Sequence, residues 1–123
     1  MINKCYNSTM KLKDVLELCS GKILCGESHL EDEVDFAFAS DMMSDVLTLL
    51  EDNILLITGL SSNQAVRTAV MSDIRNIVIA RNKIPSQDMI AMANEFDIAI
   101  ITSGFSMYRV SGALFNKGLK HIY

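Results

Sequence analysis

The pattern of apolar and polar residues changes at about residue 54. After that point, three short runs that are apolar at every position alternate with longer segments of helical periodicity, and the runs are Ile54–Ile57, Ile77–Ala80 and Ile98–Ile101. A strand that is apolar on both faces is typical of a parallel sheet covered by helices on its two sides. Residues 54–118 therefore predict a βαβαβα unit with parallel strands and right-handed crossovers.

The first half of the chain predicts a helix, a hairpin and a second helix. Apolar residues recur at helical spacing over residues 12–19, and Gly21 is expected to cap this helix. The strands of the hairpin are expected at Lys22–Cys25 and Val34–Ala39. A second helix is expected to carry the apolar residues between Met42 and Leu50.

Together the two halves predict a single three-layer α/β domain with a mainly parallel sheet and an N-terminal helix–hairpin–helix extension. The second hairpin strand alternates apolar and polar positions, which places Val34 and Phe36 on one face. Ser40 follows this strand as an N-cap for the next helix. At 123 residues, one domain is expected, over residues 11–123, after a polar arm of residues 1–10.

Composition and charge narrow the classes of function. Half of the residues are hydrophobic, and 15 acidic against 11 basic residues give a net charge of −4. A protein that tracks a phosphate backbone is normally basic, so a nucleic-acid partner is not expected. The N-terminus has no apolar signal segment, and no apolar run approaches the roughly 18 residues that a membrane span needs. Three cysteines, expected as reduced thiols, agree with a cytoplasmic protein rather than a disulfide scaffold.

The three turns that follow the apolar strands carry candidate ligand-binding residues. In open parallel sheets, ligands bind beyond the carboxyl ends of the strands, and neighbouring strands bring such turns to one edge. The candidates are the polar residues of these turns and one glycine: Thr58, Gly59, Ser61, Ser62, Asn63, Arg81, Lys83, Thr102, Ser103 and Ser106.

The chemistry of these turns favours a small anionic ligand, such as a metabolite with a phosphate group. Uncapped amides at a helix N-terminus bind anions, hydroxyl groups add donors, and Arg81 and Lys83 add positive charge. The spacing is neither that of a P-loop nor that of a dinucleotide-binding fingerprint. The alternative is that the turns only end strands and cap helices, since Ser61 with Gln64 matches a capping box and Ser106 fits an N-cap.

The other reactive side chains do not predict a catalytic or metal site. The acidic segment from Glu27 to Asp35 contains His29, but its spacing is not that of a calcium loop, and a solvated loop accounts for it. Cys19 lies on an apolar helical stripe, where a thiol packs as a small hydrophobic group. The sequence places neither His29 nor His121 beside a nucleophile, so we expect no enzyme activity, no metal and no cofactor.

The last predicted helix is apolar over more than one stripe. Its apolar residues are Met107, Tyr108, Val110, Leu114 and Phe115. They cover more of the helix than contact with a single core requires, so part of this surface is expected to meet a second subunit in a homodimer. The alternative is a helix packed deeply against the sheet.

Five segments of the second half carry a recognisable series of motifs: Gly59–Gln64, Val66–Ala69, Ala80–Lys83, Ser106–Tyr108 and Gly118–Leu119. In order and spacing, these segments resemble those of small stand-alone DRTGG-domain proteins of anaerobic bacteria. The N-terminal part also resembles these proteins, so the resemblance covers nearly the whole chain from about Lys11. Such proteins are often encoded near iron-only hydrogenase components.

Resemblance to the DRTGG domain family implies an α/β regulatory domain without catalytic activity of its own. In longer relatives the domain stands beside phosphotransacetylase, a protein-serine kinase, or nucleotide-binding modules in a pyrophosphatase, where it contributes to a dimer. The name-giving residues differ here: Gly59–Ser61 stand in place of Gly-Asp-Arg, and Ala80–Asn82 in place of Thr-Gly-Gly. Ligand roles of those family residues are therefore not carried over to this chain.

The sequence thus favours a non-catalytic regulatory domain that senses a small anionic metabolite or nucleotide at the strand ends and acts as a homodimer. The alternative is an adaptor or structural protein of a hydrogenase-related redox complex, with no small-molecule site. A partner enzyme or regulator fits both hypotheses. A thermal shift with nucleotides or phosphorylated metabolites would favour the first, and an exposed apolar patch on the first or last helix would favour the second.

Overall fold

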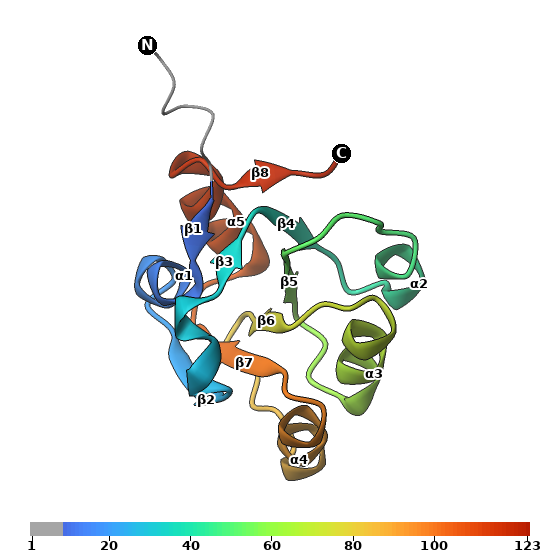
Figure 1. Cartoon of the computed structure of the whole chain (residues 1–123). Helices are drawn as coiled ribbons and strands as arrows, with labels where there is room; N and C mark the ends of the chain where they lie inside the picture. Colours follow the sequence, from blue (N-terminus) through green and yellow to red (C-terminus); the bar gives the residue numbers. More distant parts are fainter. Residues whose placement is uncertain (1–8) are drawn as a thin grey trace.

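The computed structural model describes residues 9–123, which form three layers around a six-stranded sheet (Figure 1). The strand order is β2-β7-β6-β5-β4-β8, and every neighbouring pair is parallel except β2 with β7. The strands of this sheet are β2 (Lys22–Cys25), β4 (Phe36–Ala39), β5 (Ile54–Thr58), β6 (Asn76–Ile79), β7 (Ala99–Thr102) and β8 (Lys120–His121). The predicted mainly parallel sheet is confirmed, with its three apolar strands β5, β6 and β7 adjacent to one another.

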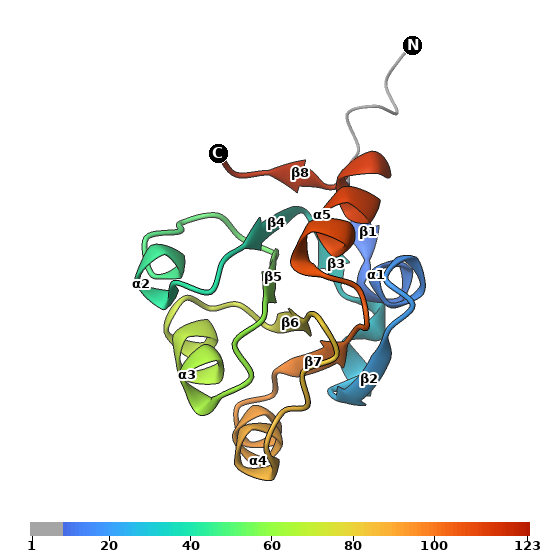
Figure 2. The ribbon, with the colours of Figure 1, turned by 180° about the vertical axis from the view of Figure 1, so that it is seen from behind.

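Helices cover both faces of the sheet (Figure 1 and Figure 2). Three of them, α2 (Met43–Val46), α3 (Asn63–Met71) and α4 (Gln87–Glu95), pack on one face. The other two, α1 (Leu12–Leu18) and α5 (Met107–Asn116), pack on the opposite face. The sheet therefore lies between two helical layers, as the sequence predicted for an α/β domain.

Each face of the sheet has its own hydrophobic core, and the central strands contribute to both. Leu56 and Ile77 lie in the core of α2, α3 and α4, whereas Leu55 and Val78 lie in the core of α1 and α5. All four side chains are fully buried. This arrangement explains the uninterrupted apolar runs, because alternate residues of a strand point to opposite sides of the sheet.

The C-terminal half agrees with the sequence in the type and order of its elements. Ser86 and Ser106 cap α4 and α5, since each hydroxyl accepts a hydrogen bond of 3.1 Å from the backbone amide three residues later. Gly118, the last residue of the predicted βαβαβα unit, follows α5 with a φ of 100°, a conformation that glycine adopts easily. The capping box expected at Ser61 is wrong, because Ser62 is the N-cap residue of α3 and no side chain caps this helix.

The predicted N-terminal hairpin is also wrong. β2 and β4 are separated by three strands, because β2 pairs antiparallel with β7 and β4 pairs in parallel with β5. The antiparallel ribbon of this half forms instead between β1 (Met10–Lys11) and β3 (Glu33–Val34). A short 3-10 helix, η2 (Glu27–Glu31), connects β2 to β3. The chain between the two predicted hairpin strands therefore crosses from one edge of the sheet towards the other.

A break at Asp35 divides the predicted strand Val34–Ala39 into two strands. The backbone amide of Asp35 donates to the carbonyl of Asn53 at 2.9 Å, and its carboxylate accepts from the side-chain amide of Asn53 at 2.8 Å. As a result, Val34 lies in the core of α1 and α5, whereas Phe36 packs against the opposite core. The alternation in the sequence placed both residues on one face, but the contacts with Asn53 turn the chain between them.

The end of α1 differs from the prediction in the residue that adopts a left-handed conformation. Ser20, with a φ of 49°, takes this role instead of Gly21. Gly21 is required for space, because a Cβ atom at this position would lie 2.6 Å from Cγ2 of Ile101. The close approach of the chain to β7, rather than helix capping, therefore explains the glycine.

The polar arm predicted for residues 1–10 lies outside the described residues except for its last two. Thr9 precedes the first strand, and Met10 begins β1. Within residues 9–123, every helix is too short or too polar to cross a membrane.

Candidate ligand site at the strand ends

The carboxyl ends of β4, β5, β6 and β7 lie at one edge of the sheet. These four strands are parallel neighbours, so the turns after them lie side by side in the same order. We call this edge the strand-end rim, formed by residues 40–41, 58–63, 80–83 and 102–106. The rim contains all ten residues selected from the sequence, together with Asp41, which the sequence did not suggest as a site residue.

An internal carboxylate holds the first turn of the rim. Asp41 Oδ1 accepts hydrogen bonds from the hydroxyl of Thr58 at 2.9 Å and from the backbone amide of Gly59 at 2.6 Å. The Thr58 hydroxyl in turn accepts from the amide of Leu60 at 3.1 Å. The donors of Thr58 and Gly59, which the sequence offered to an anionic ligand, are thus already paired with an anion of the chain itself.

The N-terminus of α3 remains open. Ser61, Ser62 and Asn63 are half-buried, and their side chains form no hydrogen bond within residues 9–123. Oδ1 of Asn63 is buried without a partner there. The first amides of a helix have no partner inside the helix, so this end of α3 presents donors and a partial positive charge.

The second turn joins β6 to the turn after β7. Arg81 and Asn82 both have left-handed backbone conformations, with φ values of 64° and 57°. Their amides donate to the carbonyls of Phe105 at 2.7 Å and Ser103 at 2.9 Å. Arg81 is exposed and Lys83 is half-buried, and neither forms an ion pair in the described part of the chain. The backbone of this turn is fixed, whereas its two cations are free.

The third turn uses its hydroxyl groups for structure. Ser103 is buried, donates to the carbonyl of Cys19 at 2.6 Å and accepts from the amide of Phe105 at 3.1 Å. Ser106 caps α5, as described above. Thr102 is half-buried at the end of β7. The structure therefore commits two of the three hydroxyl candidates of this turn to internal hydrogen bonds.

Arg109, in the first turn of α5, lies over an aromatic ring. Its guanidinium carbon is 3.6 Å from the centre of the Phe105 ring. A guanidinium stacked on an aromatic face is held by a cation–π attraction. Arg109 therefore fixes the start of α5 to the third turn.

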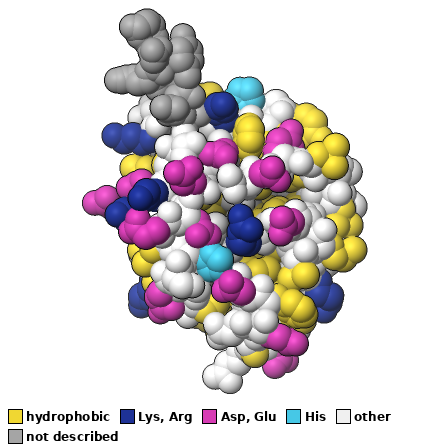
Figure 3. Space-filling model, in the orientation of Figure 1, with side chains coloured by type: hydrophobic (Ala, Val, Ile, Leu, Met, Phe, Trp, Pro, Cys, Tyr) yellow, Lys and Arg dark blue, Asp and Glu magenta, His cyan; other side chains and the backbone are white. Residues whose placement is uncertain are grey.

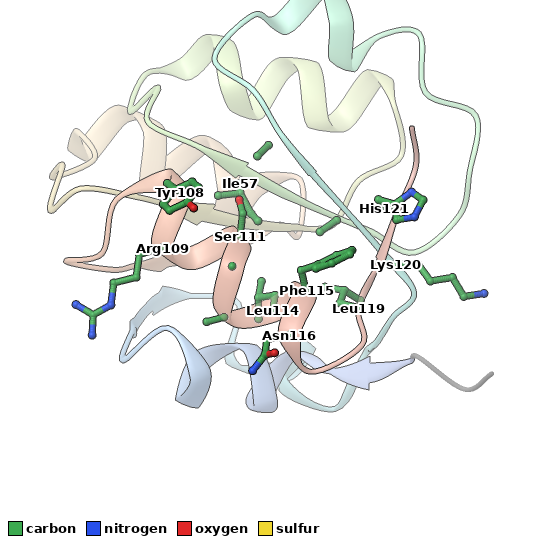
Figure 4. Close-up of a pocket in the computed structure, with 14 residues that line it drawn as sticks. Ile57, Tyr108, Arg109, Ser111, Leu114, Phe115, Asn116, Leu119, Lys120 and His121 are labelled. Carbon is green, nitrogen blue, oxygen red and sulfur yellow. The ribbon is translucent and has the colours of Figure 1, made fainter. Parts of the chain in front are cut away.

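A groove of about 1000 Å³ runs beside α5 (Figure 4). Its floor includes Ala37, Ala39 and Ile57 of the sheet, and α5 and β8 form its walls. Two aromatic side chains of α5 line it, with Tyr108 90% exposed and Phe115 64% exposed. The second apolar surface that the sequence predicted for the last helix is thus confirmed as an exposed one.

The acidic segment between Glu27 and Asp35 is not simply a solvated loop. Acidic side chains do gather on the face that carries β1 and β3 (Figure 3). His29, however, is buried between Asp32 and Asp97, at the edge of the sheet opposite the strand-end rim. The sequence missed this contact because Asp97 follows His29 by 68 residues. Among residues 9–123, no three His, Cys, Asp or Glu side chains are arranged to hold a metal ion.

The two described cysteines are buried free thiols. Cys19 packs in the core of α1 and α5, as its position on the apolar stripe predicted, and Cys25 packs in the opposite core. Burial raises the pKa of both thiols. A nucleophilic cysteine has a lowered pKa, so neither thiol has the environment of an activated nucleophile.

Comparison with known proteins places this chain in a family. The model of the DRTGG domain matches residues 14–116, most of the chain. A crystal structure of the CBS and DRTGG domains of the regulatory region of Clostridium perfringens pyrophosphatase, complexed with the activator diadenosine tetraphosphate, is similar in fold, with a TM-score of 0.66 and 12% sequence identity. The similarity covers 87% of this chain and 46% of that chain, so this chain spans about half of that relative's length. A search of curated proteins gave no match. The chain belongs to the DRTGG domain family.

Proposed function

We propose that the chain is a non-catalytic regulatory domain that binds a small anionic metabolite or nucleotide at the strand-end rim and acts as a homodimer. One observation carries the ligand part of this proposal. The cations Arg81 and Lys83 and the N-terminus of α3 have no partner within residues 9–123, although most other polar groups of the rim are paired. An anionic ligand is the chemistry that satisfies cations and open helix amides together.

The N-terminus of α3 supplies the hydrogen-bond donors of the proposed site. The amide of Ala65 donates to the carbonyl of Ser62 at 3.1 Å, whereas the amides of Asn63 and Gln64 have no acceptor among the described residues. The hydroxyls of Ser61 and Ser62 lie at the same helix end. A phosphate group binds such an end through several amides at once, and the helix dipole adds to the attraction.

Asp41 tunes the affinity of the proposed site. Its carboxylate occupies the donors of Thr58 and Gly59, so it sits in the first turn as a tethered anion. A bound phosphate group next to it is repelled unless Arg81 or Lys83 compensates the charge. The site is therefore expected to hold a compact anion moderately rather than tightly, as suits a sensor of changing concentrations.

The comparison adds a class of ligand to this proposal. The similar region of the pyrophosphatase is regulatory and was crystallised with a dinucleotide activator. Because this chain corresponds to about half of that region, the dinucleotide enters here only as one compound to test. The regulatory context supports a sensing role over a catalytic one.

A thermal-shift screen tests the ligand part directly. The probes are inorganic phosphate, nucleoside mono-, di- and triphosphates and diadenosine tetraphosphate. A ligand at 100 times its Kd adds about 2.7 kcal/mol to the free energy of unfolding, which raises the midpoint measurably. Absence of any shift with all of these probes would contradict the proposed site.

Paired variants then locate the site. Arg81→Gln combined with Lys83→Gln is expected to weaken binding more than tenfold, since hydrogen bonds to charged groups contribute about 1.5–3 kcal/mol each. Arg75→Gln is the matched control, because Arg75 is an exposed cation just before β6, at the edge opposite the rim. Equal affinity in both variants would place the ligand elsewhere.

The groove beside α5 supports the homodimer part of the proposal. Tyr108, Ser111, Gly112 and Phe115 recur at the spacing of one helical stripe and line this groove. Two aromatic residues thus flank two small ones. A Cβ atom added to Gly112 would meet nothing within 4 Å, so the middle of the stripe is open to an incoming helix.

This stripe is symmetric about its centre, which favours a second copy of the chain as the occupant. If two α5 helices cross antiparallel between Ser111 and Gly112, Tyr108 lies against the partner's Phe115 on both sides of the two-fold axis. In this register Arg109 lies level with the partner's Leu114 along the helix pair and Lys117 lies level with the partner's Ser106, so cations do not meet cations. Small residues at the crossing allow the two backbones to approach closely.

The surface available to such a dimer is small but sufficient for a weak association. Four aromatic side chains at about 150 Å² each supply about 600 Å², and stable interfaces bury about 1,200–2,000 Å² in total. The apolar floor of the groove, with Ala37 and Ala39, contributes further area. The homodimer is therefore expected to dissociate on dilution.

Sedimentation velocity over a concentration series tests the homodimer. Gly112→Glu is expected to abolish it without unfolding the protomer, because the new side chain points into open space. Ala91→Glu is the matched control, since Ala91 is exposed on α4 on the other face of the sheet. Concentration-independent monomer in the wild type, or an unchanged dimer in Gly112→Glu, would contradict the proposed interface.

The adaptor hypothesis rests on the same groove. An exposed apolar groove fits a partner protein as well as a second copy. A wild-type monomer that none of the phosphate probes stabilises would favour docking of a partner enzyme over ligand sensing. The two experiments above therefore decide between the two functions.

A further inference from the structure

A buried imidazole joins three segments of the chain at the edge opposite the strand-end rim. His29 is only 7% exposed, although it lies in the short 3-10 helix η2. Its ring reaches Asp32, at the end of η2, and Asp97, in the turn before β7. Asn76, the first residue of β6, donates its side-chain amide to the same Asp32 oxygen at 3.5 Å. The cluster therefore links η2, in the N-terminal half, to the amino ends of β6 and β7.

Both nitrogens of the ring face oxygen atoms that are hydrogen-bond acceptors. Nδ1 lies 2.5 Å from Oδ2 of Asp32. Nε2 lies 2.9 Å from the carbonyl oxygen of Asp97 and 3.1 Å from its Oδ1. A neutral imidazole has one N–H donor and one lone pair, so it would place its lone pair against a carboxylate or a carbonyl. Only the protonated ring, with two donors, satisfies all of these contacts.

We propose that His29 is a protonation-dependent clamp, which holds η2 against β6 and β7 as an imidazolium and releases this segment when the ring loses its proton. Deprotonation removes one donor and leaves a buried lone pair facing an oxygen atom. It also leaves two carboxylates at one site without the cation between them. Local opening of the segment is then less costly, because its contacts no longer favour the closed state.

The direction of titration agrees with this geometry. Burial by itself lowers the pKa of His29, but the hydrogen bonds and negative charges of Asp32 and Asp97 outweigh it, so the pKa is raised above the usual value of 6.5. A raised pKa in the folded state stabilises the fold below pH 6.5, and this stabilisation is lost as the pH rises through the folded-state pKa. The clamp is therefore closed at acidic pH and opens as the pH rises through the folded-state pKa of His29.

Two carboxylates face the His29 ring, and the other ionisable groups near it point elsewhere. Asp32 faces it from the end of η2 and Asp97 from the turn before β7, whereas Glu31 of η2 forms ion pairs with Lys11 and Lys13 instead. Glu27 is exposed at the start of η2. The thiol of Cys25 contacts the carbonyl of Ile98 and not the imidazole. The two aspartates therefore set the protonation of His29.

An NMR titration of the wild-type imidazole tests the clamp without any substitution. His121, which is exposed, supplies a second imidazole in the same spectrum. The His29 ring is expected to show two protonated nitrogens at pH 6 and to titrate above 6.5. A single protonated nitrogen at pH 6, or a midpoint at or below 6.5, would overturn the proposal.

Variants separate the clamp from ordinary packing. The Asp97 side chain is 78% exposed, so Asp97→Asn keeps the fold and is expected to lower the titration midpoint of His29. Asp73→Asn is the control, an exposed acidic residue in the left-handed turn after α3. Equal midpoints in the two variants would contradict a role of Asp97 in the clamp.

Hydrogen exchange measures the release itself. After correction for the intrinsic pH dependence of exchange, amides of residues 26–34 in the wild type are expected to lose protection between pH 6 and pH 9, whereas amides of α4 are not. In His29→Gln the protection of residues 26–34 is expected to be low at both pH values. Constant protection of this segment in the wild type would show that deprotonation does not open it and would overturn the proposal.

Discussion

The two edges of the sheet treat their polar groups in opposite ways. At the edge where β6 and β7 begin, His29 uses both ring nitrogens, one towards Asp32 of its own segment and one towards Asp97 of a distant one. At the strand-end rim, Arg81 and Lys83 have no ion pair within residues 9–123, and α3 begins without a side-chain cap. An edge where a buried imidazole is held by acceptors on both sides connects parts of a fold, whereas an edge with open cations and amides is available to a ligand.

The strongest test of this contrast compares one glycine at each edge. Gly26 has a φ of 82°, and a Cβ atom there would lie 2.5 Å from the backbone of Ala99. Backbone strain and overpacking together make Gly26→Ala cost about 3 kcal/mol in the free energy of unfolding. Urea denaturation measures this value.

Gly104→Ala is the matched change at the rim. The nearest atom to its added Cβ is Oδ1 of Asn82 at 3.6 Å, an ordinary contact. We expect a change within about 0.5 kcal/mol. Similar losses of stability in Gly26→Ala and Gly104→Ala would contradict the description of a closed edge and an open one.

Two serines sharpen the comparison within the rim itself. Ser103→Ala leaves the carbonyl of Cys19 and the amide of Phe105 without their buried partner, so we expect a loss of about 1–3 kcal/mol. Ser62→Ala removes a hydroxyl with no internal hydrogen bond and is expected to cost less than about 0.5 kcal/mol while weakening phosphate binding. Chemical denaturation and a phosphate titration of both variants measure these effects. If Ser103→Ala were as stable as the wild type but bound phosphate more weakly, Ser103 would belong to the ligand site and its internal hydrogen bonds would not stabilise the fold.

The pH dependence of stability tests the closed edge. Since the pKa of His29 is raised in the folded state, the wild type is expected to be more stable than His29→Gln at pH 6 and to lose this advantage as the pH rises through that pKa. Each unit by which the pKa is raised contributes about 1.4 kcal/mol to this difference. Thermal unfolding of both proteins from pH 5.5 to 9 gives the result. A difference that stays constant with pH would assign His29 to packing alone.

The smallest expected effect concerns the internal anion of the rim. Asp41→Asn keeps an oxygen that accepts from Thr58 and Gly59 but removes the negative charge, so phosphate affinity is expected to rise a few-fold. Asp45→Asn, an exposed acidic residue on α2, serves as the control. Calorimetric titration with inorganic phosphate measures both variants, and weaker binding in Asp41→Asn would show that the carboxylate helps to build the site instead of opposing the ligand.

The sequence predicts the C-terminal half of the fold well because its elements are specified locally. Each apolar run is followed by a polar turn and by the N-cap serine of the next helix. Consecutive βα units then favour right-handed crossover connections. The N-terminal half depends on contacts between distant segments. β2 pairs with β7, and β4 with β5 and β8, although local spacing suggested a hairpin.

The same distinction holds for the candidate site. The polar turns follow directly from the ends of the three strands, so all ten candidate residues lie at one rim. The carboxylate of Asp41 reaches the first turn only because β4 lies beside β5. The sequence predicted that β4 would pair with β2 in a hairpin, so it did not predict this contact. His29 was hidden for the same reason, since its partner Asp97 is distant in the chain and close only in the fold.

Chemical-shift mapping on the isotope-labelled wild-type protein tests the central claim most directly. Titration with the anionic probe that gives the largest thermal shift is expected to move the amide signals of Ser62, Asn63, Arg81 and Lys83 first. These residues come from two separate turns, and only the rim brings them together. Shifts confined to the α5 groove or the η2 segment, or no shifts with any probe, would contradict ligand sensing at the strand ends.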